Sequence, residues 1–173
     1  MNGLNPRDMY NEDWINIDGN KIHRTAIIDP CVTLGKGNRI GPYAVIGGNA
    51  EVRNVRDCKG RVVIGDNNTI SEHVTIQRPV NADRVTYVGN GNIIMAHAHL
   101  GHDVMVCNNT EICTSTVLGG YVTVKDGARI KLHCVVRNRI TVGTGATVGM
   151  GSVVTKDVAD GAVVYGNPAK PKA

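Results

Sequence analysis

The sequence predicts an all-β protein, a parallel β-helix built from hexapeptide repeats. Aliphatic residues keep one phase, every sixth position, from Ile22 to Val154, and 21 of these 23 positions are Ile, Leu or Val. Small side chains usually lie four residues after each aliphatic anchor, and glycine often follows the anchor directly. Neither a helical period nor a simple strand alternation keeps one phase over such a length. Each six-residue unit is therefore expected to form a short strand and a corner, with small residues where the chain turns.

Three units are expected to form one triangular coil of about 18 residues, so that residues 18 positions apart lie one above the other. Residues 22–159 then give about seven to eight coils. Residues 1–21 form a polar N-terminal segment without an apolar run, and residues 160–173 lose the phase and are expected to cap the last coil. The 42% apolar content of the 173 residues fits one compact domain with a continuous core.

The repeat weakens at two places, and the second is expected to form a loop that leaves the prism. Around residues 53–61 the unit is highly charged and its anchor position is Cys58. Residues 77–86 include Pro79 and place Ala82 at the anchor position. Such loops often carry ligand contacts, although simple drift at a corner explains the pattern equally well.

Composition excludes several classes of protein. The net charge is +4, and the basic residues are scattered without the interleaved aromatic residues of a nucleic-acid binder. This mild positive charge would still attract phosphorylated ligands or an acidic carrier protein. The five cysteines form no CxxC pair, which argues against a disulfide framework or a zinc ribbon. With no signal peptide or membrane-spanning run in the N-terminal segment, we expect a cytoplasmic protein without membrane insertion.

Histidine is concentrated where the repeat is most regular. The segment MAHAHLGHDV contains His97, His99 and His102, with Asp103 beside the last. Polar residues that are not anchors point outward or toward a neighbouring subunit, so these imidazoles are not expected to fill the core. Several histidines beside a carboxylate indicate a functional site.

The 18-residue spacing places a glycine over one of these histidines. Gly120 follows His102 by one coil, and Tyr121 follows Asp103. The space above His102 would then admit a substrate, and the Gly120 N–H would face an oxyanion. Alternatively, Gly119 and Gly120 only relax a corner.

Residues 22–172 resemble the hexapeptide acyltransferases. The stretches RVVIGDNNTISEHVTIQRP, NIIMAHAHLGHDV and TSTVLGGYVTV are most similar to the UDP-N-acetylglucosamine acyltransferases of lipid A biosynthesis. This resemblance implies a left-handed coil and a homotrimer with its active sites between subunits. It further implies that no bound cofactor is needed and that an acyl thioester is the co-substrate.

The resemblance also implies roles for single residues. His102 would be the general base, Asp103 would orient it, and the Gly120 N–H would hold the thioester oxyanion. His99 would contact the acceptor sugar, with His97 as a further substrate-binding candidate. A neutral imidazole can take a proton from an attacking alcohol or amine and return it to the departing thiol.

The chain departs from that family at several positions. Gln77, Tyr121 and Arg137 replace histidines of the family, so they are kept as candidate substrate-binding residues. Two early coils and the helical C-terminal domain of the family are missing. The closing segment DGAVVYGNPAKPKA is instead similar to acetyl-CoA-dependent sugar acetyltransferases, which favours a short acyl donor held near Lys156 and Lys170. The donor, an acyl-CoA or acyl carrier protein thioester, and the choice between O- and N-acylation stay open.

Two other classes remain as alternatives. A γ-class carbonic anhydrase would hold zinc with histidines spaced like His97 and His102, but Gln77 occupies the position of the third ligand. An ice-binding solenoid would show an unbroken rank of threonines, and here Tyr87 and Met105 interrupt that rank. The sequence therefore predicts a homotrimeric acyltransferase that uses a sugar-nucleotide acceptor, with no bound metal.

Overall fold

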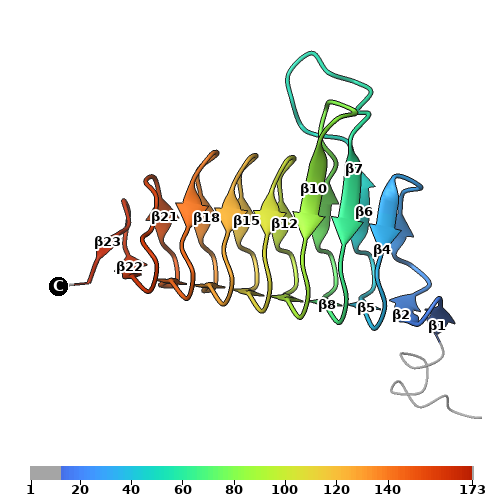
Figure 1. Ribbon diagram of the computed structural model, residues 1–173, viewed down its shortest axis with the longest axis horizontal. Coiled ribbons are helices and arrows are strands. Elements are labelled where there is room, and N and C mark those ends of the chain that lie inside the picture. The colour runs from blue at the N-terminus through green and yellow to red at the C-terminus, as the bar shows by residue number, and fades with distance from the viewer. Residues whose placement is uncertain (1–12, 173) are drawn as a thin grey trace, which may run out of the picture.

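The structure, a computed structural model, describes residues 13–172 and shows a long prism whose three sides are largely parallel β-sheets (Figure 1). The chain passes through sheet A, sheet B and sheet C in turn and then returns to sheet A one coil further along. The coil is left-handed. The predicted fold class, a left-handed hexapeptide β-helix, is therefore confirmed.

Short strands build each side of the prism. Sheet A consists of β1 (Trp14–Ile17), β2 (Asn20–His23), β5 (Arg39–Ile40), β8 (Thr69–Ile70), β11 (Ile93–Ile94), β14 (Glu111–Ile112), β17 (Arg129–Ile130), β20 (Thr147–Val148), β22 (Val163–Tyr165) and β23 (Lys170–Pro171). Sheet B consists of β3 (Ile27–Ile28), β6 (Val45–Gly48), β9 (Thr75–Gln77), β12 (His99–Leu100), β15 (Val117–Leu118), β18 (Val135–Val136) and β21 (Val153–Val154). Sheet C consists of β4 (Val32–Leu34), β7 (Arg61–Ile64), β10 (Val85–Val88), β13 (Met105–Val106), β16 (Thr123–Val124) and β19 (Thr141–Val142).

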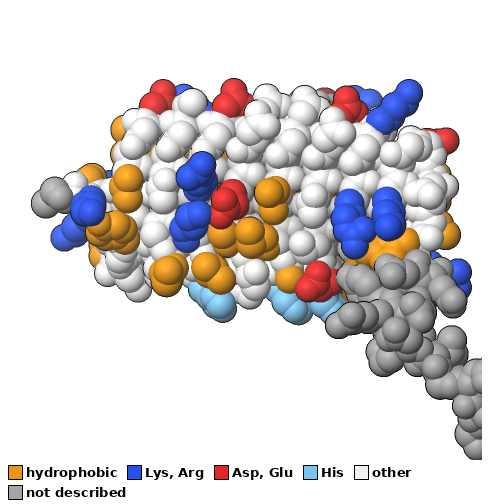
Figure 2. All heavy atoms as spheres, turned by 90° about the horizontal axis from the view of Figure 1, so that it is seen from below, with side chains coloured by type: hydrophobic (Ala, Val, Ile, Leu, Met, Phe, Trp, Pro, Cys, Tyr) orange, Lys and Arg blue, Asp and Glu red, His pale blue; other side chains and the backbone are white. Residues whose placement is uncertain are grey.

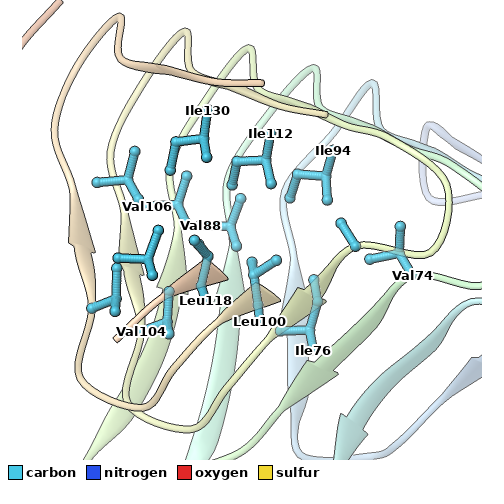
Figure 3. Close-up of a cluster of buried hydrophobic side chains, with 14 of the residues drawn as sticks. Val74, Ile76, Val88, Ile94, Leu100, Val104, Val106, Ile112, Leu118 and Ile130 are labelled. Carbon is cyan, nitrogen blue, oxygen red and sulfur yellow. The ribbon is translucent and has the colours of Figure 1, made fainter. Parts of the chain in front are cut away.

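The hexapeptide anchors fill the inside of the prism. Ile94, Ile112 and Ile130 from sheet A are fully buried and lie one above another (Figure 3). Branched side chains of similar shape stack from coil to coil, so the core is continuous and closely packed. The two anchor positions that are not Ile, Leu or Val differ in burial. Cys58 is buried but lies outside any strand, whereas Ala82 is exposed.

The chain leaves the prism at both weak points of the repeat, as predicted for residues 77–86, and this changes the stacking rule. Partners in adjacent coils are 18 residues apart in the later part of the chain, as for Tyr87 and Met105. The first loop (residues 49–60) and the second loop (residues 78–84) project together from the prism (Figure 1). As a result Thr75 pairs with His99, 24 residues away, and Val45 pairs with Thr75. Side chains near the loops therefore meet at spacings that the repeat alone does not give.

A ladder of buried amides keeps these coils in register. Asn20, Asn38, Asn68 and Asn92 stack at the corner between sheets C and A, and all four are buried. The side-chain oxygen of each accepts a hydrogen bond from the backbone N–H of the next member, at 2.8–2.9 Å, and Thr110 ends the ladder. Because buried amides need partners, this ladder fixes the alignment of the coils between which the loops are inserted.

The ends of the prism use antiparallel pairing. β1 pairs antiparallel with β2, and β23 pairs antiparallel with β22, which itself continues sheet A. Residues 1–12 of the expected N-terminal segment lie outside the described residues, so its boundary stays a prediction, as does that of the C-terminal cap. The described part of the chain contains no helix that could cross a membrane.

The outer faces differ in polarity. The face of sheet A carries charged side chains, among them the ion pair between Lys131 and Glu111 at 2.7 Å. Apolar side chains and histidines gather along one long edge of that face (Figure 2). Exposed apolar side chains also point outward from sheet B, at Ile27, Val117 and Val135. Sheet B and its edge with sheet A therefore expose several apolar side chains.

Candidate active site

A histidine–aspartate pair occupies the corner between sheets B and C, where the chain turns from β12 to β13. His102 Nδ1 lies 2.8 Å from Asp103 Oδ2, and the side chains are only 15% and 4% exposed. Asp103 has a left-handed φ of 59°, which Asp tolerates better than most residues. Its backbone N–H donates a hydrogen bond to Thr86 Oγ1 at 2.9 Å. These contacts fix both side chains at the turn.

The carboxylate sets the tautomer of the imidazole. A carboxylate only accepts hydrogen bonds, so His102 carries its proton on Nδ1 when neutral and leaves a lone pair on Nε2. Nε2 faces the next coil: a Cβ atom placed on Gly120 would lie 2.6 Å from it. The expected stacking of Gly120 on His102 is present. The expected open space above His102 is not, because the imidazole itself occupies it.

The Gly120 N–H is free to meet a ligand. Among the described residues it donates no hydrogen bond, and the same holds for the N–H groups of His102, Asn138 and Lys156, which occupy this corner in other coils. A backbone N–H without a hydrogen bond is therefore common to these coils at the corner between sheets B and C. At Gly120 the free donor lies beside a basic nitrogen, and this combination suits stabilisation of an oxyanion.

Tyr121 and two arginines surround the pair. The Tyr121 ring packs edge-on against His102, with the ring centroids 5.1 Å apart. The guanidinium carbons of Arg139 and Arg84 lie 4.2 Å and 5.4 Å from the centre of the Tyr121 ring. Tyr121 was predicted as a site residue, but the arginines were not. Arg139 follows Tyr121 by one coil, so the repeat could have predicted that the two lie together. Arg84 belongs to the second loop, where the repeat predicts no neighbours.

A separate small pocket lies on the outer face of sheet B, beside the first loop. It has a volume of about 190 Å³ and is lined by Glu51, Gln77 and His99, among others. His99 Nδ1 lies 2.7 Å from Thr75 Oγ1. Burial lowers the pKa of His99, and the Glu51 carboxylate partly offsets that shift. The structure thus brings together the predicted residues Gln77 and His99, and adds Glu51 and Thr75, which the sequence analysis missed.

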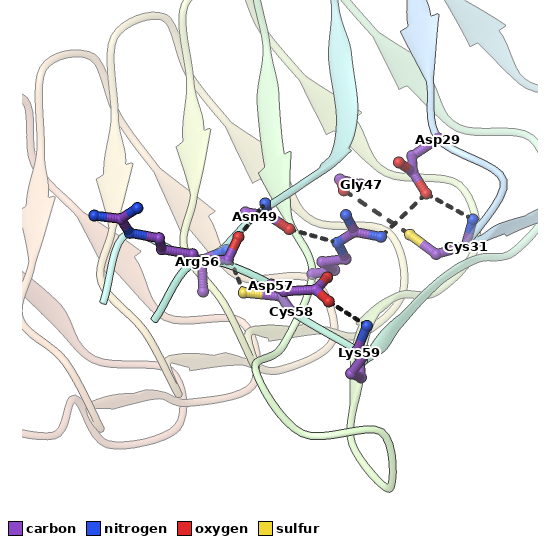
Figure 4. A network of polar contacts seen from close by, with 10 residues as sticks. Asp29, Cys31, Gly47, Asn49, Arg56, Asp57, Cys58 and Lys59 are labelled. Carbon is purple, nitrogen blue, oxygen red and sulfur yellow. Dashed lines mark hydrogen bonds and ion pairs between the residues drawn. The ribbon is translucent and has the colours of Figure 1, made fainter. Parts of the chain in front are cut away.

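The wall of this pocket is held by an arginine outside it. Arg78 donates hydrogen bonds to Asn49 Oδ1 at 3.0 Å and to Asp29 Oδ1 at 3.2 Å. Figure 4 shows this network at the base of the first loop, where Asn49 also bonds to the Arg56 carbonyl. The backbone N–H of Cys31, with a smaller contribution from Arg78, lowers the pKa of Asp29. The start of the loop that carries Glu51 is therefore tied to the prism.

His97 and Arg137 lie apart from His102. His97 is at the corner between sheets A and B, where its ring stacks on His73 at 4.8 Å and His73 stacks on Tyr43 at 5.1 Å. Arg137 is exposed just beyond β18, in the second coil after His102. Within residues 13–172, no three His, Cys, Asp or Glu side chains are grouped so that they could hold a metal ion.

Lys156 and Lys170 line one cavity at the C-terminal end of the prism. The cavity measures about 390 Å³, and apolar residues such as Val154, Val158 and Val164 form much of its wall. Lys156 occupies the same corner as His102, three coils further along. Three strand spacings of about 4.8 Å place it about 14 Å along the axis from the imidazole. The two lysines predicted to act together are thus brought together.

The fold and the corner site define a class, the left-handed hexapeptide β-helices with a histidine–aspartate pair between coils. No family model matches the sequence, but individual relatives do. The sequence is 34% identical to the acyl-[acyl-carrier-protein]–UDP-N-acetylglucosamine O-acyltransferase of Pseudomonas putida, over 100% of this chain and 74% of that protein. The chain belongs to this family of O-acyltransferases. The resemblance predicted from the motifs is therefore confirmed.

Other relatives match over a smaller part of their length. The enzyme of the same name from Stutzerimonas stutzeri is 36% identical over 81% of this chain, and the chain spans only 55% of it. Among solved structures, the UDP-N-acetylglucosamine acyltransferase of Bacteroides fragilis superposes with a TM-score of 0.85 at 31% identity, over 89% of this chain and 60% of that one. The Francisella novicida enzyme gives a TM-score of 0.77 at 29% identity, over 92% and 68% of the two chains.

Proposed function

We propose that the protein transfers an acyl group from a thioester to a hydroxyl group of a sugar nucleotide, with His102 as the general base. The observation that carries the proposal is the buried His102–Asp103 pair, whose free Nε2 lies beside the unbonded N–H of Gly120. Both groups are needed for acyl transfer, one to take a proton and the other to stabilise negative charge. Family membership supports the same activity.

The proposed transfer is direct and needs no acyl-enzyme intermediate. The acceptor hydroxyl gives its proton to His102 Nε2 as its oxygen forms a bond to the thioester carbon. Negative charge then develops on the carbonyl oxygen, where the Gly120 N–H can donate to it. Asp103 stabilises the imidazolium through Nδ1–H. The C–S bond breaks, the imidazolium returns the proton to the thiolate, and an ester and a free thiol are released.

We place the acceptor between the small pocket on sheet B and the corner. His99, Gln77 and Glu51 supply a hydrogen-bonding floor of the kind that recognises sugar hydroxyls. Because burial lowers the pKa of His99, its imidazole is held in the neutral form, which both donates and accepts. Tyr121 and Arg137 lie further along the same edge as candidates for the nucleotide. The relatives are named for UDP-N-acetylglucosamine and O-acylation, and we propose that acceptor here.

We place the donor along the corner that runs from His102 to Lys156. Gly120 and Asn138 occupy this corner between the two residues, and the cavity lined by Lys156 and Lys170 lies at its end. The lysines would bind the phosphate of a pantetheine arm, and the apolar wall would cover its chain. The relatives are named for acyl carrier protein, which supports an acyl carrier protein thioester as the donor over acetyl-CoA. The five cysteines are all unpaired thiols, so a reducing cytoplasm stays the expected compartment.

The donor and acceptor can be tested together. Purified protein should convert UDP-N-acetylglucosamine to its O-acyl ester with acyl carrier protein thioesters, as measured by mass spectrometry and by thiol release. Acetyl-CoA and dTDP- or GDP-sugars serve as alternative substrates. K156A/K170A should raise KM for the donor while leaving KM for the acceptor unchanged. Absence of ester with every donor and acceptor would contradict the proposed activity.

We propose a homotrimer in which sheet B of each subunit contacts its neighbour. The outer face of sheet B carries Val117 and Val135, which are 38% and 44% exposed, and Met150 is 73% exposed at its edge. Apolar surface of this extent is typical of subunit contacts. His97 lies on the same edge, so we assign it to the neighbour's side of the site. The stacking of the His97 ring on His73 is compatible with a contact between subunits.

The assembly makes a specific prediction. Wild-type protein should sediment as a trimer of 18.5 kDa chains, and V117E/V135E should sediment as a monomer with little activity. The matched control is T147E, on the polar face of sheet A, which should remain trimeric and active. A fully active wild-type monomer would rule out a site completed by a second subunit.

A further inference from the structure

One oxygen of the buried carboxylate beside His102 has no hydrogen bond. Asp103 Oδ2 accepts from His102, but Oδ1 is buried without a hydrogen-bonding partner in the described part of the chain. The Asp103 side chain is 4% exposed, so bulk water does not solvate this oxygen. A buried and unsatisfied charged oxygen is costly, and such groups often mark a contact that forms during function.

Arg84 is the cation placed to satisfy this oxygen. Its Nε lies 3.7 Å from Asp103 Oδ1, within ion-pair range but beyond hydrogen-bond range. The backbone of Arg84 is held on both sides, because its N–H donates to the Asn81 carbonyl and its own carbonyl accepts from the Arg61 N–H. The side chain is 52% exposed and lines an open cavity of about 390 Å³ together with Asp83 and Asp103. A fixed backbone and a half-exposed guanidinium allow the small movement that would close the contact.

Arg84 also reaches the second group that packs on the base. Its guanidinium lies over the ring of Tyr121, whose edge contacts His102. The charged and titratable groups around His102 are therefore Asp103, Arg84, Tyr121 and Arg139, with Asp83 on the far side of Arg84. In the described part of the chain, Arg84 is the only lysine or arginine within ion-pair distance of Asp103.

We propose that Arg84 is a positioning residue that holds the His102–Asp103 pair in its active geometry. This inference rests on the proposed function, in which His102 acts as the base. A hydrogen bond from Arg84 to Oδ1 would stop the carboxylate from rotating away from Nδ1. The carboxylate would then keep the imidazole in the orientation that points Nε2 toward Gly120.

The test follows the hydrogen bond between His102 and Asp103 itself, so that it does not depend on turnover. Two-dimensional NMR of the full chain would record the Nδ1–H signal of His102, which reports this hydrogen bond. In R84M the signal should broaden or disappear, because the carboxylate is then free to rotate, and kcat should fall while KM for both substrates stays unchanged. R84K, which keeps the charge and a donor, should resemble the wild type.

Matched variants separate the outcomes. R84A provides a second substitution without a donor, and R129M removes a cation from the face of sheet A and should leave the signal unchanged. The inference is wrong if R84M and R84A keep the wild-type Nδ1–H signal, or if R84K loses it as R84M does. A loss of kcat in R84M with an unchanged Nδ1–H signal would likewise reduce Arg84 to a structural residue. If His102→Ala stayed active, the proposed base would fail instead, and the Nδ1–H signal of R84M would still report on Arg84.

Discussion

Replacing His102 by alanine should remove most of the acyl transfer while the β-helix stays folded. General-base catalysis contributes roughly a hundredfold to ten-thousandfold, or about 3 to 5 kcal/mol of the barrier. The imidazole is 15% exposed and pairs with a buried carboxylate, so it is more enclosed than an outward-facing histidine was expected to be. Its loss leaves Asp103 Oδ2 without a donor, and we expect the free energy of unfolding to fall by about 1–3 kcal/mol.

Steady-state kinetics, circular dichroism and thermal melting check this result. His133→Ala is the control, because this histidine is exposed at the corner between sheets A and B, away from the corner that holds the pair. His97→Ala should cost less activity than His102→Ala. The zinc-enzyme alternative predicts instead that both changes abolish activity and remove bound metal together, which elemental analysis would show. If His102→Ala kept more than about half of the wild-type rate, His102 would not be the base.

The architecture could be predicted because one physical constraint repeats along the chain. Every coil must bury the same kind of branched side chain. The spacing of residues such as Ile94, Ile112 and Ile130 therefore predicts the fold before any contact between them is known. The same regularity predicted that Gly120 stacks on His102. The prediction of an open space between them was wrong, since a rotamer that points Nε2 toward the next coil depends on the partner of Nδ1.

The surroundings of the pair could not be predicted in the same way. Thr75 meets His99 across 24 residues because the second loop is inserted between them, and no multiple of the coil gives that distance. Glu51 and Arg84 reach the two sites from the loops, whose paths are set by contacts such as that of Arg78 with Asn49 and Asp29. The loop sequences do not follow the hexapeptide repeat, so the repeat does not predict which residues their side chains contact. Those contacts become known only with the structure.

The substitution of Gly120 by alanine should abolish most activity without unfolding the protein. Gly120 does not have a left-handed φ, so alanine fits its backbone and would reduce the freedom of the unfolded chain. The added Cβ, however, would lie 2.6 Å from His102 Nε2 and 2.7 Å from Cε1. The imidazole must swing aside, and its hydrogen bond to Asp103 must break or distort. We expect turnover to fall by roughly a hundredfold, as for loss of a general base.

The neighbouring glycine supplies the control for this prediction. A Cβ on Gly119 would meet the backbone N of Asn138 at 2.8 Å as well as its side chain, so G119A should lower the melting temperature by straining the coil. The three atoms nearest to a Cβ on Gly120 all belong to the imidazole of His102, so G120A should melt no lower than H102A. Because G120A acts through His102, adding it to H102A should cause little further loss. If the two losses multiplied, or if G120A kept wild-type turnover, the close stacking of glycine and imidazole would not be what sets the base in place.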